Sequence, residues 1–184
     1  MKFVDPIRNI EDINKVQAYL YEKSQRDYLL FVFGINTALR ISDIITLKVK
    51  DVVNQKHIIV YEKKTGKRQM IYLNDKVKNI IGDYVSFHKL KPNSYLFYSQ
   101  NDGRIHIKRI QAWRIISEAT IICKIDGNYG THTLRKTFCY QAYLKTKDIA
   151  SIMRLLNHTN LESTFRYLGI NQDTFDDLHK TVIL

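Results

Sequence analysis

Two short stretches of the chain pair a basic side chain with a second polar group at helical spacing. In TALRISDI, Arg40 precedes Asp43 by three residues, and in HTLR, His132 precedes Arg135 by three. Side chains three residues apart lie on the same face of a helix, so each pair can act on one ligand. An arginine fork binds phosphate oxygens bidentately, and a histidine changes its charge near neutral pH. Alone, the first pair is more often an ion pair, and the second is a common pattern that can be a helix-capping polar pair.

A run of basic residues surrounds the dipeptide Thr65-Gly66 between two β-prone segments. The run consists of Lys63, Lys64, Lys67 and Arg68. Such a run commonly does no more than protect a strand edge from aggregation. It also suits a basic finger in a DNA groove, with one lysine close enough to a phosphate to donate a proton.

The fourth candidate pair is a histidine followed nine residues later by a tyrosine. The stretch LNHTNLESTFRY contains His158 and Tyr167. A phenol has a reference pKa of about 10 and must lose its proton when it attacks as a nucleophile. With 6 His and 12 Tyr in the chain, one such pair can arise by chance.

Apolar periodicity and turn signals predict the elements that position these groups. Helices are expected over 9–24 and 26–39, with Ser42 as the N-cap of a short turn, so Arg40 falls at a junction between helices. Thr65-Gly66 predicts a β-hairpin with glycine at positive φ. The hairpin spans 57–73, a strand is expected over 95–99, and further helices over 75–90, 107–125, 133–144, 148–156, 161–168 and 172–182. The fold class is therefore mainly α with a small antiparallel β-sheet (α+β).

Composition limits the class of protein. A chain of 184 residues with 45% hydrophobic residues suits one packed domain. The net charge of +11 and a pI near 9.6 favour a polyanionic partner, nucleic acid ahead of anionic lipid. Cys123 and Cys139 lie in apolar helical patterns without a CxxC partner, which predicts buried thiols. The amino terminus lacks a secretory signal, and the longest apolar run, 28–35, is too short to span a membrane.

Taken in order, the four stretches resemble the catalytic boxes of the tyrosine recombinase (phage integrase) family, from about residue 25 to the end. TALRISDI resembles the first-arginine box, KKTGKRQMIYL the lysine hairpin, HTLRKTF the second box and LLNHTNLESTFRYLGI the nucleophile box. The resemblance implies the catalytic-domain fold of DNA breaking-rejoining enzymes. It also implies six catalytic residues: Arg40, Lys64, His132, Arg135, His158 and the nucleophile Tyr167. Two departures are Asn157, where the family commonly has glycine, and Lys136, where many members have histidine.

The resemblance implies a DNA transesterification through a 3′-phosphotyrosyl intermediate. Arg40, Arg135 and His158 would stabilise the charge on phosphorus, and His132 would accept the proton of Tyr167. The sequence has no GxxxxGK[ST] loop, no HExxH motif and no acidic cluster, so no cofactor, metal or ATP is expected.

The remaining roles are also implied by the resemblance. Lys64 would protonate the departing 5′ oxygen, with Lys63 and Lys67 as alternatives, and Asp43 would orient the base. Lys63, Lys67 and Arg68 would contact DNA.

The expected organisation is one catalytic domain over 1–184, without an amino-terminal core-binding domain. It would consist of a first helix in 1–24, a catalytic core over 25–170 and a carboxy-terminal helix over 171–184. In the family this last segment packs on a neighbouring protomer, although docking on its own domain is equally compatible with its apolar pattern. The expected partners are double-stranded DNA and further copies in a tetramer on DNA, with no membrane, in the cytoplasm at the nucleoid.

The function expected from this resemblance is site-specific recombination, as in integration, excision or inversion by a mobile genetic element. A type IB topoisomerase would share the same site but only relax strands. A DNA-binding regulator that has lost catalysis is the alternative from another class, and the six filled positions argue against it.

Overall fold

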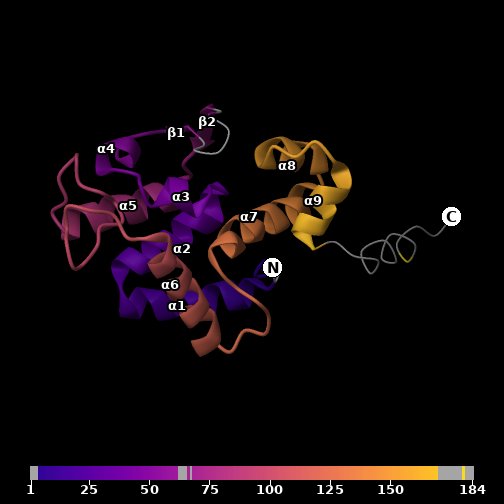
Figure 1. The fold of residues 1–184 in the computed structure, drawn as a ribbon, viewed down its shortest axis with the longest axis horizontal. Helices are drawn as coiled ribbons and strands as arrows, with labels where there is room; N and C mark the ends of the chain where they lie inside the picture. Colours follow the sequence, from indigo (N-terminus) through magenta and orange to yellow (C-terminus); the bar gives the residue numbers. More distant parts are fainter. Residues whose placement is uncertain (1–3, 62–65, 67, 170–179, 181–184) are drawn as a thin grey trace. The chain divides into compact units, whose positions relative to one another are not determined.

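The chain was analysed as a computed structural model, which describes residues 4–61, 66, 68–169 and 180. The chain forms two compact units, 1–138 and 139–184 (Figure 1). The first unit contains α1 (Ile10–Lys23), α2 (Gln25–Thr37), α3 (Ile41–Ile44), α4 (Val49–Val52), β1 (His57–Tyr61), β2 (Arg68–Tyr72), α5 (Asp75–Phe87) and α6 (Arg109–Ile122). The unit boundary lies within α7 (Thr131–Thr146), and the second unit contains α8 (Ile149–Leu156) and α9 (Leu161–Leu168). The predicted fold class is confirmed.

Helix α2 forms the centre of the first unit. Its sequence is apolar on nearly every side, which is typical of a helix enclosed by others. Helices α1 and α5 both pack against it (Figure 1). Phe33 is fully buried and meets the ring of Phe97 edge to face, with 6.0 Å between the centroids. The end of α2 is therefore a fixed platform for the residues that follow it.

Local caps set the helix limits close to those predicted. Asn9 accepts a hydrogen bond from the amide of Glu11 at the start of α1. Ser24 ends α1 and caps α2, because its hydroxyl accepts from the amide of Asp27. Each cap satisfies an amide that has no partner within its helix.

The hairpin is confirmed. Strands β1 and β2 pair antiparallel, with His57 opposite Tyr72 and Tyr61 opposite Arg68. Gly66 has φ +67°, as the turn signal predicted. Alternate side chains, including Ile58 and Ile71, are buried on one face, and the other face is exposed.

Two local predictions are wrong. Residues 95–99 form no strand but only two isolated bridges, Lys48 with Tyr95 and Tyr98 with His106. Their β-prone side chains are instead core residues, since Phe97 is fully buried. Ser42 is not an N-cap: α3 begins at Ile41, and the Ser42 hydroxyl donates to Oδ1 of Asp43 over 3.3 Å. The helix predicted over 172–182 lies outside the described residues, apart from Lys180.

The first residues of the described chain are bonded to segments far along the sequence. The Asp5 amide donates to the carbonyl of Asn128 over 2.7 Å, and the Asn128 amide donates to Oδ2 of Asp5 over 3.0 Å. The amide of Ile7, a fully buried residue, donates to Oγ1 of Thr137 on α7 over 2.9 Å. These bonds, here called the amino-terminal brace, fix the loop before α7 and its first turns.

In the second unit, α8 and α9 pack on each other. Asp148 and Asn160 cap their amino ends by accepting from the amides of Ser151 and Ser163. Both helices end in a left-handed residue, Asn157 after α8 and Gly169 after α9. Asn157 has φ 59°, so asparagine fills a position that glycine fills most easily.

Candidate active site

Arg40 lies at the junction between α2 and α3, as predicted. Ala38 ends α2 in the left-handed region with φ 54°, and Arg40 is extended, with φ −72° and ψ 144°. A non-glycine residue in that region costs about 1–2 kcal/mol, which the buried surroundings must offset. The reversal at Ala38 places its carbonyl and the Arg40 side chain in the same tight turn.

The second box occupies the first turns of α7. His132 is the second residue of α7, and Arg135 follows one turn later. The Gly130 amide donates to Oγ1 of Thr133 over 3.0 Å at the start of the helix. Arg135 is buried, with 4% of its surface exposed, and its Nη1 donates to the carbonyl of Ala38 over 2.7 Å. Two sequence boxes almost a hundred residues apart are therefore joined directly.

The charges of both arginines act on His132. The side chain is exposed, but neighbouring protein atoms partly desolvate the ring. That desolvation, followed by the positive charges of Arg135 and Arg40, lowers the pKa of His132 below its ordinary value. The neutral imidazole, which can accept a proton, is therefore favoured at neutral pH.

Asp43 lies within α3, one turn after Arg40. Its carboxylate is buried, with 3% exposed, and accepts from the Ser42 hydroxyl. Its amide donates to the carbonyl of Arg40 over 2.9 Å. Asp43 is thus part of the same turn as the first arginine, and its role in orienting His132 stays a prediction.

In the second unit, the nucleophile box brings its two candidates together. The rings of His158 and Tyr167 meet edge to face, with 5.5 Å between the centroids and 81° between the planes. Nδ1 of His158 lies 3.0 Å from Oγ1 of Thr164, and that hydroxyl donates to the carbonyl of Asn160 over 3.3 Å. The direction of the bond between the Thr164 hydroxyl and Nδ1 follows from the tautomer of the ring. His158 is therefore held in place by the helix that carries Tyr167.

The structure does not place every predicted residue. Lys63, Lys64 and Lys67 lie outside the described residues. Arg68 is described, and its side chain is exposed on β2 opposite Tyr61.

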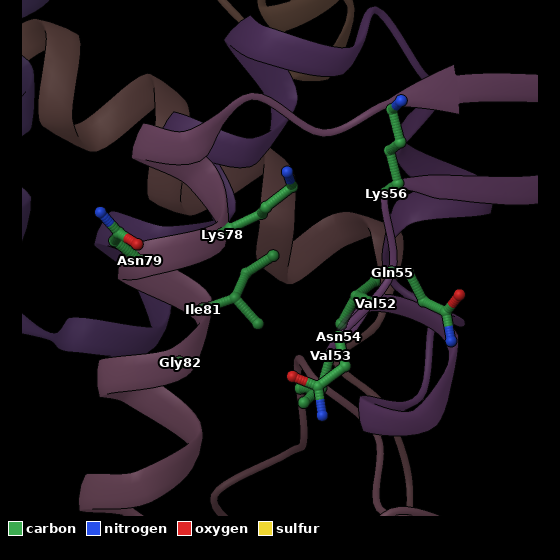
Figure 2. Close-up of a pocket in the computed structure, with 9 residues that line it drawn as sticks. All are labelled: Val52, Val53, Asn54, Gln55, Lys56, Lys78, Asn79, Ile81 and Gly82. Carbon is green, nitrogen blue, oxygen red and sulfur yellow. The ribbon is translucent and has the colours of Figure 1, made fainter.

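A pocket of about 500 Å³ lies between the segment 52–56 and α5 (Figure 2). Lys56 and Lys78 line it, and in Figure 2 both ammonium groups point to the same end while the amide of Asn54 points to the opposite one. Nζ of Lys78 is bound by Asp75 over 3.0 Å, so its charge is partly balanced. The pocket contains none of the six predicted catalytic residues. Exposed lysines carry no spacing signal, so the sequence alone could not indicate it.

Within the described residues, no group of three or more His, Cys, Asp or Glu side chains is arranged to hold a metal ion. Neither Cys123 nor Cys139 forms a disulfide. Cys139 is buried, whereas Cys123, the C-cap of α6, is only half-buried, so the prediction of buried thiols is wrong for Cys123. Among the described helices, none has the length and hydropathy needed to cross a membrane.

The fold defines the class of protein. It superposes on the crystal structure of XerA recombinase with a TM-score of 0.79 over 98% of this chain and 66% of that one, at 20% identity. The catalytic domain of bacteriophage HP1 integrase gives a TM-score of 0.65 at 19% identity, over 97% of this chain and 95% of that one. The fold is that of tyrosine recombinase catalytic domains.

The sequence then defines the family. Residues 7–173 match the phage integrase family. The chain is 49% identical over 174 residues to the probable integrase/recombinase YoeC of Bacillus subtilis (strain 168), covering 95% of this chain and 94% of the relative. It is 32% identical over 160 residues to a tyrosine recombinase of Pseudothermotoga lettingae, covering 86% of this chain but only 54% of that one. The chain belongs to the phage integrase family, the class of site-specific tyrosine recombinases, as the sequence predicted.

Proposed function

We propose that the chain cleaves and rejoins double-stranded DNA at specific sites, using Tyr167 as the nucleophile. The observation that carries this proposal is the bond from Arg135 to the carbonyl of Ala38, which brings the second box against the turn that holds Arg40. Two guanidinium groups beside one imidazole form a positively charged site for a phosphate. DNA-bound structures of related recombinases, such as XerH with its difH substrate, support DNA as the partner.

In the proposed reaction, fixed donors stabilise the charge that develops on the phosphate. Arg40 and Arg135 would bind the non-bridging oxygens, and each such donor contributes about 10²–10³ in rate. His158 would add a third donor from Nε2. The bond to Thr164 engages Nδ1, so the donor to the phosphate would be Nε2.

Bonds and protons balance without a metal or ATP. The Tyr167 oxygen attacks phosphorus and its proton passes to His132, a bond forms to the tyrosyl oxygen, and the bond to the 5′ oxygen breaks. Lys64 would protonate the departing 5′ oxygen, with Lys63 or Lys67 as alternatives. Rejoining is the reverse sequence with a new 5′ hydroxyl. Asp43 is assigned as a positioning residue for His132.

The proposed assembly is a tetramer on DNA. Lys63, Lys67 and Arg68 would contact the backbone from the hairpin, and residues 171–184 would dock on a neighbouring protomer. The apolar spacing of Phe175, Leu178 and Val182 supports a docking helix. A protein that acts on the chromosome in this way would work in the cytoplasm, at the nucleoid.

The direct test is capture of the covalent intermediate. Duplexes from the DNA that flanks the gene for this chain, nicked just 3′ of the scissile phosphodiester and labelled on the cut strand 5′ of it, are incubated with protein in chelator. We expect the label to become attached to protein in a denaturing gel, and Tyr167→Phe to abolish the attachment.

Three other results would contradict the proposal. Failure of the wild-type chain to form an adduct on any flanking duplex would favour a DNA-binding regulator. Plasmid relaxation without joined products would favour a topoisomerase. An adduct that survives Tyr167→Phe would exclude this tyrosine as the nucleophile.

A further inference from the structure

A second pocket, here called the aromatic pocket, lies in the first unit between the end of α1, the start of α2 and the last turns of α5. Its volume is about 220 Å³, and its lining is Tyr21, Gln25, Tyr28, Ile80, Asp83, Tyr84 and Phe87. None of these belongs to the proposed catalytic residues. Ligand pockets for whole small molecules usually measure about 300–1,000 Å³, so this one suits a single side chain.

The lining is unusual for a strongly basic chain. With 29 Lys and Arg against 18 Asp and Glu, a surface pocket would be expected to include a cation, yet this one has none and includes Asp83. Four of its residues are aromatic. Tyr21 and Phe87 are 61% and 70% exposed, so their rings are available to a ligand. Tyr21 stands edge-on to Tyr28, with 5.2 Å between the centroids.

Charge complementarity favours a cation there. Asp83 is exposed, so its carboxylate is available beside the aromatic rings. The aromatic pocket therefore offers π faces and a carboxylate, both of which attract a cation that donates hydrogen bonds.

We propose that the aromatic pocket binds an arginine side chain presented by a protein partner. A planar guanidinium stacks on aromatic faces, and two of its donors can pair with the Asp83 carboxylate at the same time. A lysine ammonium is a compact, strongly hydrated charge and satisfies this geometry less well. The lining residues take no part in the proposed DNA chemistry.

The test uses N-acetyl-arginine amide as the probe, titrated into the isotope-labelled full chain and followed by NMR. We expect saturable shifts of the Gln25 side-chain amide and the Asp83 backbone amide. Asn54, which lines the pocket of Figure 2, supplies an internal reference whose side-chain amide stays unshifted. The citrulline derivative has the same shape without the charge, and we expect no saturable shift with it.

Matched variants separate the aromatic pocket from the general surface. Tyr21→Leu should weaken arginine binding about two- to fivefold by removing a π face. Asp83→Asn should weaken it by up to about fivefold. Tyr61→Leu removes a tyrosine of similar exposure, 64%, outside the pocket and should leave binding unchanged. Equal shifts with citrulline, equal affinity for the lysine derivative, no response to arginine, or binding that survives both pocket variants would overturn the proposal.

Discussion

His132 is the residue at which the electrostatics of the site have a measurable consequence. Its neighbours are cations, so the charged imidazolium is disfavoured before DNA arrives. A base must be neutral to accept the proton of Tyr167. A lowered pKa keeps His132 neutral over a wider range of acidic pH than an ordinary histidine.

The pH dependence of cleavage tests this role. Activity is lost as pH falls through the pKa of the base, and that pKa lies below the usual value of about 6.5. We therefore expect the acid limb of kcat/KM, which reports the free enzyme, to lie below pH 6.5. His132→Gln should remove this limb and reduce the rate by about 10²–10⁴. An acid limb at or above pH 6.5, or one that remains in the variant, would exclude His132 as the base.

For single residues, the sequence predicts the types of the catalytic side chains better than the groups that these side chains contact. Phosphate chemistry restricts the useful residue types, so Arg40, His132 and Arg135 could be selected by type and order. The bond from Arg135 to the carbonyl of Ala38 could not be predicted, because it depends on how α7 lies against the end of α2. Ser42 was misassigned for a related reason: burial of Ile41 and Ile44 starts α3 two residues earlier than the local cap signal indicates.

The contact between α2 and α7 depends on a glycine. A Cβ added to Gly34 would lie 2.5 Å from Cδ1 of Leu134 and 3.0 Å from its Cβ. Leu134 is buried and directly precedes Arg135. The absence of a side chain at Gly34 therefore allows α7 to bring its arginine to the turn at Ala38.

Gly34→Ala should therefore impair both stability and cleavage. We expect about 1–3 kcal/mol of lost stability from overpacking, measured by urea unfolding, and a lower rate of adduct formation. Gly82→Ala is the matched control, because nothing lies within 4 Å of its added Cβ on α5. That change should stabilise the chain by about 0.5–1 kcal/mol. Equal effects of the two substitutions would show that the close approach at Gly34 is unimportant.

Elements with local signals were predicted well and those without were not. Caps such as Asn9, Ser24 and Asp148 define helix starts by hydrogen bonds within four residues, so their limits were correct within about two residues. Asn157 has a left-handed backbone, which accounts for an asparagine where the family commonly has glycine. Residues 95–99 were wrong because β propensity reflects packing as well as pairing, and Phe97 packs without pairing.

For the whole molecule, the proposed assembly on DNA is the property to test. Removing residues 171–184 should abolish the tetrameric complex, because the docking helix would be lost. The size of the complex on a full recombination site can be measured by sedimentation, with the intact chain as the control. Adduct formation on a single nicked half-site separates a failure of assembly from a failure of chemistry. Tetramers of normal size from the shortened chain would reject docking between protomers.

The amino-terminal brace also affects how the chain is made. Asp5 finds its partner 123 residues later and Ile7 finds its partner 130 residues later. At a synthesis rate of about 5–20 residues per second, the partner of Ile7 leaves the ribosome roughly 7–26 seconds after Ile7 itself. The first unit therefore cannot fold completely in order from its amino-terminal end. The helix that carries Arg135 is among the last parts of this unit to be fixed in position.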